Sequence, residues 1–177
     1  MKRVCQTLAL SVVMFIVPAG TLVAQGASTI KADVIKDLTQ LKGTMDKIAK
    51  EMPEDKYTYK STPPQRDYAA QVMHIATVNL MLGQMIGGKT APPTIDAKAT
   101  KKADVIQAMD TSFDYLLALA NEQTDQTMLE TVQARFLGPS TRARVFYFVV
   151  SHTQDIYGQM VVYPRLNGGV PPASQRP

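Results

Sequence analysis

Apolar residues recur at steps of three and four along four stretches of the chain, and turn-rich segments separate these stretches. Such spacing places the apolar side chains on one face of an α-helix, and no stretch alternates convincingly in the way a half-buried strand does. The pattern predicts helices over about residues 29–51, 67–86, 101–119 and 141–162. Four such helices in a chain of this length predict one all-α domain, an up-down four-helix bundle.

Residues that cap or break helices support these boundaries. Met52 is expected to end the first helix, because the residue before a proline (here Pro53) disfavours helical geometry. Gly87 and Gly88 are expected to end the second helix, which is apolar almost all round and is therefore predicted to be the most buried. Thr100 is the expected N-cap of the third helix.

Residues 1–24 have the composition of an export signal, with basic residues at the start and an apolar run over 8–17, and small residues follow at Ala24, Gly26 and Ala27. We expect cleavage between positions 24 and 27, which leaves residues 28–175 as the folded domain of an exported protein, periplasmic or extracellular. The alternative is an uncleaved anchor, because the apolar run nearly reaches membrane-spanning length. Pro18 and Gly20 favour cleavage, so no stable membrane anchor is predicted.

Composition narrows the classes of partner. The chain carries 19 basic and 15 acidic residues, and Lys2 and Arg3 leave with the signal. The remaining basic excess is too small and too dispersed for a nucleic-acid-binding protein. The single cysteine is Cys5, inside the signal. The mature chain is therefore expected to have no disulfide, no thiolate nucleophile and no cysteine-ligated zinc site.

Both histidines of the chain lie on apolar faces of predicted helices. His74 shares a helical face with Val78, and His152 shares one with Val149 and Ile156. An unpaired buried imidazole costs about 1–3 kcal/mol, so each ring needs a hydrogen-bond or metal partner. Metal sites in bundles are built from inward side chains of facing helices, so the two histidines are expected to meet in the core.

Asp155 follows His152 by three positions and lies on nearly the same helical face. His74, His152 and Asp155 would form a two-histidine, one-carboxylate metal site with open coordination positions, suited to Zn, Fe, Ni or Mn. Two alternatives stay open. In the first, Asp155 is not a ligand but either an acceptor that orients an imidazole or a solvated acid. In the second, no metal binds and the two histidines pair with neighbouring polar groups.

Other chemistries have weaker support in the sequence. Methionines beside the histidines would suit Cu(I), although methionine in a bundle more often fills the core. Ser151 adjoins His152, but consecutive helical residues point apart and do not form a nucleophile–base pair. Tyr157 is a candidate hydrogen-bond donor in a pocket, and Arg142 and Arg144 are candidates for binding an anionic substrate. The competing interpretations are that Tyr157 packs in the core and that the two arginines lie on the solvated surface.

Two segments carry a resemblance to a known family. MPEDKYTYKSTPPQRDYAAQVMHIA, from residue 52, resembles the end of helix one and the start of helix two in the DinB-like superfamily of four-helix bundles. HTQDIYGQMVVYPRLNGGVPPAS, from residue 152, is similar to the last helix and tail of that family. Together the resemblance covers roughly residues 30–175, almost the whole mature chain.

The resemblance implies a bundle that is often a homodimer. It also implies a divalent metal bound by one histidine of helix two and a His-x-x-x-His pair of the last helix. His74 matches the first of these ligands and His152 the second, whereas Ile156 stands where the family has the third. Pro164 is a second departure, and it should bend or end the last helix early.

The function implied by the resemblance is a metal-dependent hydrolase or a thiol-dependent transferase acting on an unidentified small molecule. A transferase would need an external thiol, because the mature chain has none. The alternative is a non-catalytic helical binding or interaction module in which Ile156 leaves the metal site degenerate.

Overall fold

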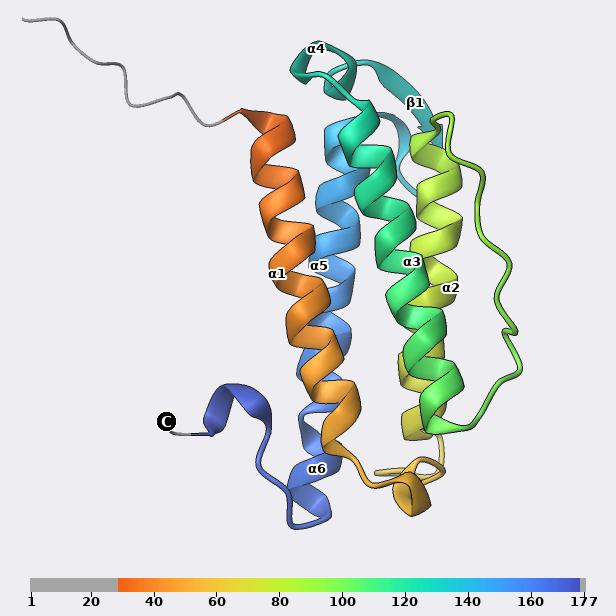
Figure 1. Ribbon diagram of the computed structural model, residues 1–177, viewed down its shortest axis with the longest axis vertical. Helices are drawn as coiled ribbons and strands as arrows, with labels where there is room; N and C mark the ends of the chain where they lie inside the picture. Colours follow the sequence, from red (N-terminus) through yellow and green to blue (C-terminus); the bar gives the residue numbers. More distant parts are fainter. Residues whose placement is uncertain (1–28, 176–177) are drawn as a thin grey trace, which may run out of the picture.

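The computed structural model describes residues 29–175, so the predicted signal peptide and its predicted cleavage region lie outside the described part of the chain. Four helices form the body: α1 (Ile30–Glu51), α2 (Tyr68–Ile86), α3 (Lys102–Glu122) and α5 (Arg142–Met160), as Figure 1 shows. The all-α bundle predicted from the sequence is confirmed. Within residues 29–175, no helix is long and apolar enough to cross a membrane.

Side-chain caps fix the start of three of these helices. Thr29, Asp67 and Thr141 each accept a hydrogen bond from the backbone N–H three residues on, at 3.1, 2.8 and 3.2 Å. The expected Thr100 cap is wrong: α3 begins one residue later, and Lys101 at its N-cap makes no side-chain bond. Glu54 of the short helix η1 (Glu54–Lys56) instead accepts from the Lys102 backbone N–H at 3.2 Å.

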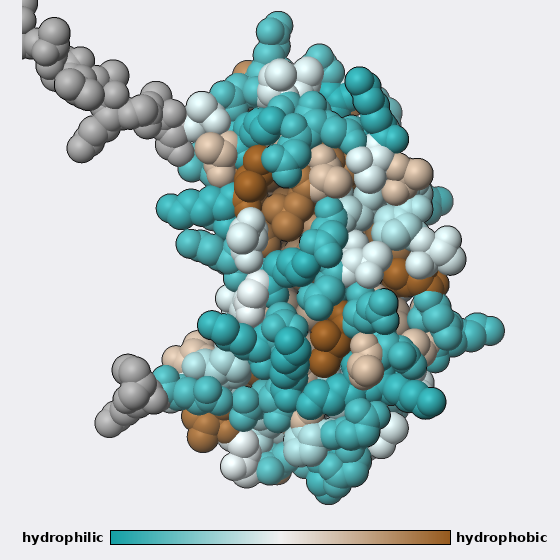
Figure 2. Space-filling model, viewed as in Figure 1, coloured by the Kyte–Doolittle hydropathy of each residue, from teal (hydrophilic) through white to brown (hydrophobic). Residues whose placement is uncertain are grey.

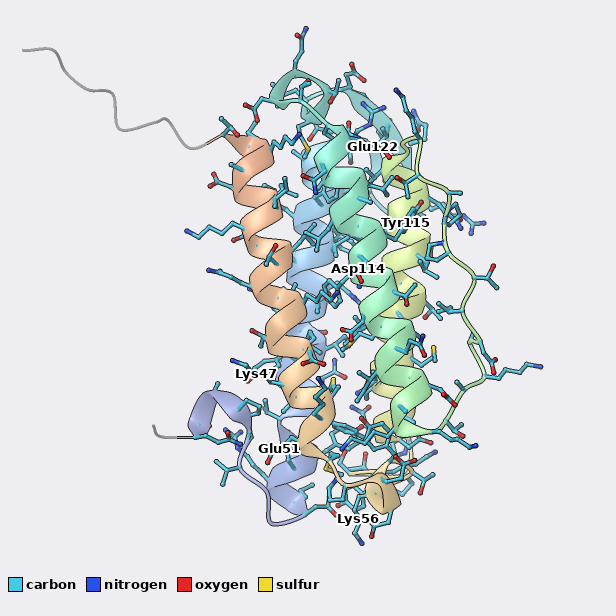
Figure 3. The ribbon with its side chains drawn as sticks, viewed as in Figure 1. Lys47, Glu51, Lys56, Asp114, Tyr115 and Glu122 are labelled. Atoms are coloured by element: carbon cyan, nitrogen blue, oxygen red, sulfur yellow. The ribbon has the colours of Figure 1, made fainter. Side chains whose placement is uncertain are left out.

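The order of helix directions differs in one respect from simple up-down alternation. Gly83 of α2 lies against Tyr115 of α3, and Gly88 lies against Glu122, so α2 and α3 run parallel (Figure 3). Residues 87–101 form a crossover that returns along the length of the bundle (Figure 1). This connector can extend to roughly 50 Å, which exceeds the length of about 28 Å expected for α2.

Each long helix packs mainly on two neighbours: α2 on α3 and α5, and α1 on the same two helices. Helices α2 and α5 run antiparallel and face each other along the layer that carries both histidines. The visible face in Figure 2 is mostly hydrophilic, with apolar side chains showing between helices. This arrangement is what brings α2 and α5 residues together at the candidate site.

One end of the bundle is closed by α4 (Asp125–Met128) and a hairpin of β1 (Thr131–Ala134) and β2 (Gly138–Thr141). The sequence pattern did not indicate these short strands. Gly138 has φ +66°, a left-handed conformation that glycine adopts without strain. Arg142 joins this end to α2, because its guanidinium donates to the carbonyls of Ile86 (3.0 Å) and Thr127 (3.1 Å) and pairs with Glu130.

The opposite end is held by buried tyrosines. The hydroxyl of Tyr57 donates to the Ala49 carbonyl at 2.5 Å, and that of Tyr68 donates to the Ile48 carbonyl. The Tyr163 hydroxyl donates to the Arg66 carbonyl at 2.6 Å. These bonds fix the segment between α1 and α2 to the end of α1 and to Tyr163, three residues beyond the end of α5, and therefore fix the backbone that leads into α2.

Helix α5 ends at Met160, and a short helix α6 (Val162–Leu166) contains the buried Pro164. This confirms the expected early end of the last helix. Proline has no N–H to donate, and its ring clashes with the carbonyl four residues earlier, which is that of Met160. The tail then runs through η2 (Pro172–Ser174), where Gln175 donates to Glu51 at 3.1 Å.

Candidate functional site

The two histidines meet between α2 and α5, as the sequence predicts. The Nε2 atoms of His74 and His152 lie 3.2 Å apart. The ring centroids are 5.1 Å apart and the planes cross at 62°, so the two rings are inclined to each other. Both side chains are partly buried.

Both imidazoles are neutral near pH 7. Burial, the positive charge of Arg66 and the neighbouring His152 ring, in that order of size, together lower the pKa of His74 to about 4. Burial also lowers the pKa of His152, Asp155 opposes that shift, and Arg66 reinforces it. A neutral imidazole keeps one nitrogen lone pair free for a hydrogen bond or a metal ion.

Two neutral rings in this geometry must be opposite tautomers when no metal lies between them. One Nε2 carries the proton and donates to the other, which accepts through its lone pair. Either choice leaves His152 Nδ1 unsatisfied, because that atom is buried and has no hydrogen-bond partner among the described residues. The pair therefore keeps one buried polar atom without a hydrogen-bond partner, which costs free energy.

The spacing of the two nitrogens fits a shared metal ion. Two nitrogens about 2.0–2.1 Å from one zinc ion at the tetrahedral angle are about 3.3 Å apart. The observed Nε2–Nε2 distance is 3.2 Å. Binding through both Nε2 atoms would make both rings Nδ1–H tautomers and remove the need for opposite protonation. The donor set therefore fits two ligands of a divalent transition metal.

The structure does not bring Asp155 to the histidines as a third ligand. Its Oδ2 accepts a hydrogen bond from Gln159 Nε2 at 3.1 Å. Among residues 29–175, no group of three His, Cys, Asp or Glu side chains lies close enough to hold a metal ion. Ile156 is 3% exposed and occupies the position of the third family ligand with an apolar side chain.

Gln159 links this carboxylate to α2. Its Oε1 accepts hydrogen bonds from Gln71 Nε2 at 3.1 Å and Gln65 Nε2 at 3.3 Å. Gln71 lies one turn before His74, and Gln159 lies two turns after His152, so the amides form the layer next to the histidines. These amides were not predicted as part of the site, although their spacing of three and seven from the histidines places them on the same helical faces.

A surface pocket of about 380 Å³ opens beside His74. Its wall combines the first half of α2 with the end of the crossover connector, and it carries two cationic side chains that were not predicted as part of the site. The polar and charged residues that line it are Arg66, Asp67, His74, Thr77, Lys98 and Thr100. The histidine pair is therefore not sealed in the core, because one of its rings borders a cavity of small-molecule size.

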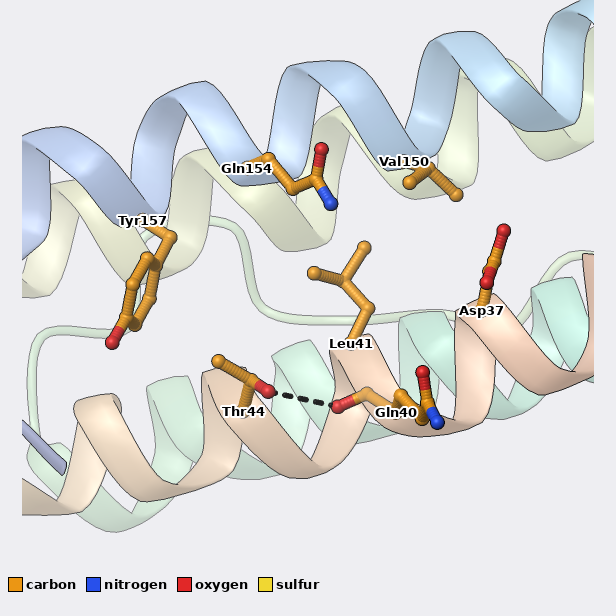
Figure 4. A pocket seen from close by; sticks show the side chains of 7 residues that line it. All are labelled: Asp37, Gln40, Leu41, Thr44, Val150, Gln154 and Tyr157. Carbon is orange, nitrogen blue, oxygen red and sulfur yellow. Dashed lines mark hydrogen bonds between the residues drawn. The ribbon is translucent and has the colours of Figure 1, made fainter. Parts of the chain in front are cut away.

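A second pocket of about 340 Å³ lies between α1 and α5 and has no histidine in its wall (Figure 4). Tyr157 lines it together with Asp37, Gln40 and Thr44. The Tyr157 hydroxyl is buried and has no partner within the described part of the chain. Tyr157 is thus directed to α1 and not to the histidine pair.

The remaining candidates from the sequence take structural roles. Ser151 Oγ donates to the Phe148 carbonyl at 3.1 Å on the exposed side of α5, so it does not pair with His152. Met73 and Met160 are buried in the core cluster that contains the tyrosines, as expected of filling side chains. Arg142 is engaged with α2 and the hairpin end, as described above.

The fold and the facing histidines define a class: helical bundles with inward imidazoles on the second and the last long helix. The chain belongs to the DinB superfamily, whose family model matches residues 37–160. No curated protein matches the chain.

Solved structures share the fold. A DinB-like protein from Bacillus cereus superposes with a TM-score of 0.70 at 17% identity, covering 81% of this chain and 96% of its own. A DinB-like protein from Bacillus subtilis gives a TM-score of 0.62 at 16% identity, covering 81% of this chain and 99% of its own. At these identities the likeness establishes the fold alone.

Proposed function

We propose that this DinB-superfamily protein binds one divalent transition-metal ion through His74 Nε2 and His152 Nε2. The observation that carries the proposal is the 3.2 Å separation of those atoms, which suits two ligands of one ion. The lowered pKa of both rings supports it, because protons compete weakly for the lone pairs.

The residues around the pair suit a metal-dependent reaction on a small molecule. A divalent ion held by two imidazoles would supply Lewis acidity and lower the pKa of bound water. The open pocket beside His74 gives a small molecule access to one side of the pair. Hydrolase or thiol-dependent transferase chemistry fits this arrangement, with the thiol supplied from outside the chain.

A second candidate function is a helical binding module without chemistry. The observation that favours it is the buried Ile156 at the third ligand position, together with the engagement of Asp155 by Gln159. In that case the histidines form a neutral hydrogen-bonded pair and bind no metal tightly. We further propose export through the N-terminal segment and assembly as a homodimer, both of which follow the sequence and the family resemblance.

Calorimetric titration of Zn²⁺ into protein purified without an affinity tag distinguishes the two functions. Metal binding predicts one ion per chain, at least about tenfold weaker binding in both His74→Ala and His152→Ala, and unchanged binding in Ser151→Ala. Asp155→Asn weakens binding only if the carboxylate moves in as a ligand. Weak binding that the histidine substitutions leave unchanged would rule out the metal site and favour the non-catalytic module.

A further inference from the structure

The pocket beside His74 is lined by two cationic side chains and by one acidic side chain. Arg66 and Lys98 both line it, and neither forms an ion pair with any residue in the described range. The acid in the pocket wall is Asp67, whose carboxylate accepts from the Ala70 backbone N–H at 2.8 Å as the cap of α2. Two cations and one engaged carboxylate therefore border the candidate metal ligand.

We propose that this pocket binds the oxyanion group of a small molecule, a carboxylate or a phosphate, between Arg66 and Lys98. A guanidinium offers paired N–H donors that match two oxygens of such a group, and an ammonium adds a second point charge. This proposal deepens the proposed function by naming the class of ligand. A role of the bound anion in a reaction rests on the proposed metal site, whereas binding of the anion does not depend on a metal.

The two cations come from segments that the fold holds in place. The Arg66 backbone carbonyl accepts from Tyr163 at 2.6 Å, which ties the start of α2 to α6. The Lys98 backbone N–H donates to Asp96 Oδ1 at 2.9 Å, which forms a local turn in the crossover connector. Replacing either side chain leaves these backbone contacts intact, so the variants are expected to fold.

The electrostatic influence of Arg66 reaches the histidine pair. Its charge lowers the pKa of both His74 and His152, after the larger effect of burial. An anion on Arg66 would cancel part of that field and change the environment of the His74 ring first, because His74 lines the pocket and His152 does not. The two histidine rings are therefore internal reporters of where an anion binds.

The test uses metal-free protein at fixed pH and ionic strength, with malonate and inorganic phosphate as separate probes. Ring proton signals of the two histidines are followed by NMR, and affinity is measured from the saturating shift. We expect a saturable shift that is larger for His74 than for His152. The preferred probe identifies the carboxylate or the phosphate as the ligand group.

Matched variants locate the site. Arg66→Gln and Lys98→Gln should each weaken binding by about tenfold, and Arg66→Lys should weaken it less than Arg66→Gln. Arg135→Gln, at an exposed arginine between β1 and β2 at the other end of the bundle, should leave the affinity unchanged. No saturable shift with either probe, or equal shifts in the wild type and Arg66→Gln, would overturn the anion pocket.

Parallel Zn²⁺ titrations keep the two proposals apart. If Zn²⁺ binds and neither anion does, the anion pocket is wrong and the metal site stands. If an anion binds at Arg66 and Zn²⁺ does not bind, the pocket stands and the metal-dependent function fails.

Discussion

Acidification should destabilise the protein through the histidine pair. The folded state holds His74 with a pKa of about 4, whereas an unfolded histidine has a pKa near 6.5. Between these values the unfolded chain binds a proton that the folded chain does not. The free energy of unfolding therefore falls as the pH drops from about 6.5 to about 4, and it gains nothing more above 6.5.

The size of the effect follows from the shift. A difference of about 2.5 pKa units corresponds to at most about 3 kcal/mol for a fully shielded group. The His74 ring is only partly buried and borders a pocket, so solvent screening reduces this to roughly 1–2 kcal/mol. Urea unfolding followed by circular dichroism at a series of pH values measures it.

The comparison with His74→Gln isolates the histidine from titrating carboxylates, because those groups are common to both proteins. The wild type should lose about 1–2 kcal/mol more than the variant between pH 7 and pH 4.5. His152→Gln serves as the matched test of the partner ring, whose pKa is lowered in the same direction. Parallel stability profiles for the wild type and both variants would refute the neutral, buried pair.

Four further substitutions test individual positions, of which Gly43 is exposed and serves as the control for Gly83. Ile156→His should add a third imidazole beside the pair and raise Zn²⁺ affinity more than about tenfold in a competitive chelator titration. Because position 156 is buried, the same change should lower the free energy of unfolding of the metal-free protein by about 2–4 kcal/mol, measured by urea unfolding. Gly83→Ala should lower the melting temperature, because the added methyl group meets the Tyr115 ring. Gly43→Ala should raise the melting temperature, because the added methyl group meets no other atom and alanine favours the helical backbone of α1; the gain corresponds to about 0.5–1 kcal/mol of unfolding free energy. Ser112→Ala should cost about 1–3 kcal/mol of unfolding free energy, because Asn79 Nδ2 loses its buried acceptor at 3.1 Å.

The meeting of the histidines could be predicted because helical periodicity fixes which face a residue occupies. His74 and His152 each share a face with buried neighbours, and two apolar faces in one bundle turn toward the same core. The break before Pro164 was predictable for a similar reason, since proline acts on the backbone locally and without reference to the fold.

The role of Asp155 and the path of the connector could not be predicted in the same way. A residue three positions after His152 is turned about 60° away from it, and Gln159 competes locally for the carboxylate. The spacing of apolar residues also does not indicate whether two neighbouring helices run parallel or antiparallel. The parallel arrangement of α2 and α3 depends on a connector, residues 87–101, that is long enough to return along the bundle. The strands β1 and β2 have four residues each, which is too short to show a clear alternation of apolar and polar positions.

The most direct test of the central claim is the protonation state of the two rings, read from long-range ¹H–¹⁵N NMR spectra with and without one equivalent of Zn²⁺. The chain has two histidines, so both rings are assignable with one substitution. In metal-free protein we predict two neutral rings of opposite tautomer, joined through Nε2. With Zn²⁺, both should become Nδ1–H tautomers and both Nε2 signals should shift together. Unchanged Nε2 signals, or a shift in one ring alone, would contradict a metal shared by His74 and His152.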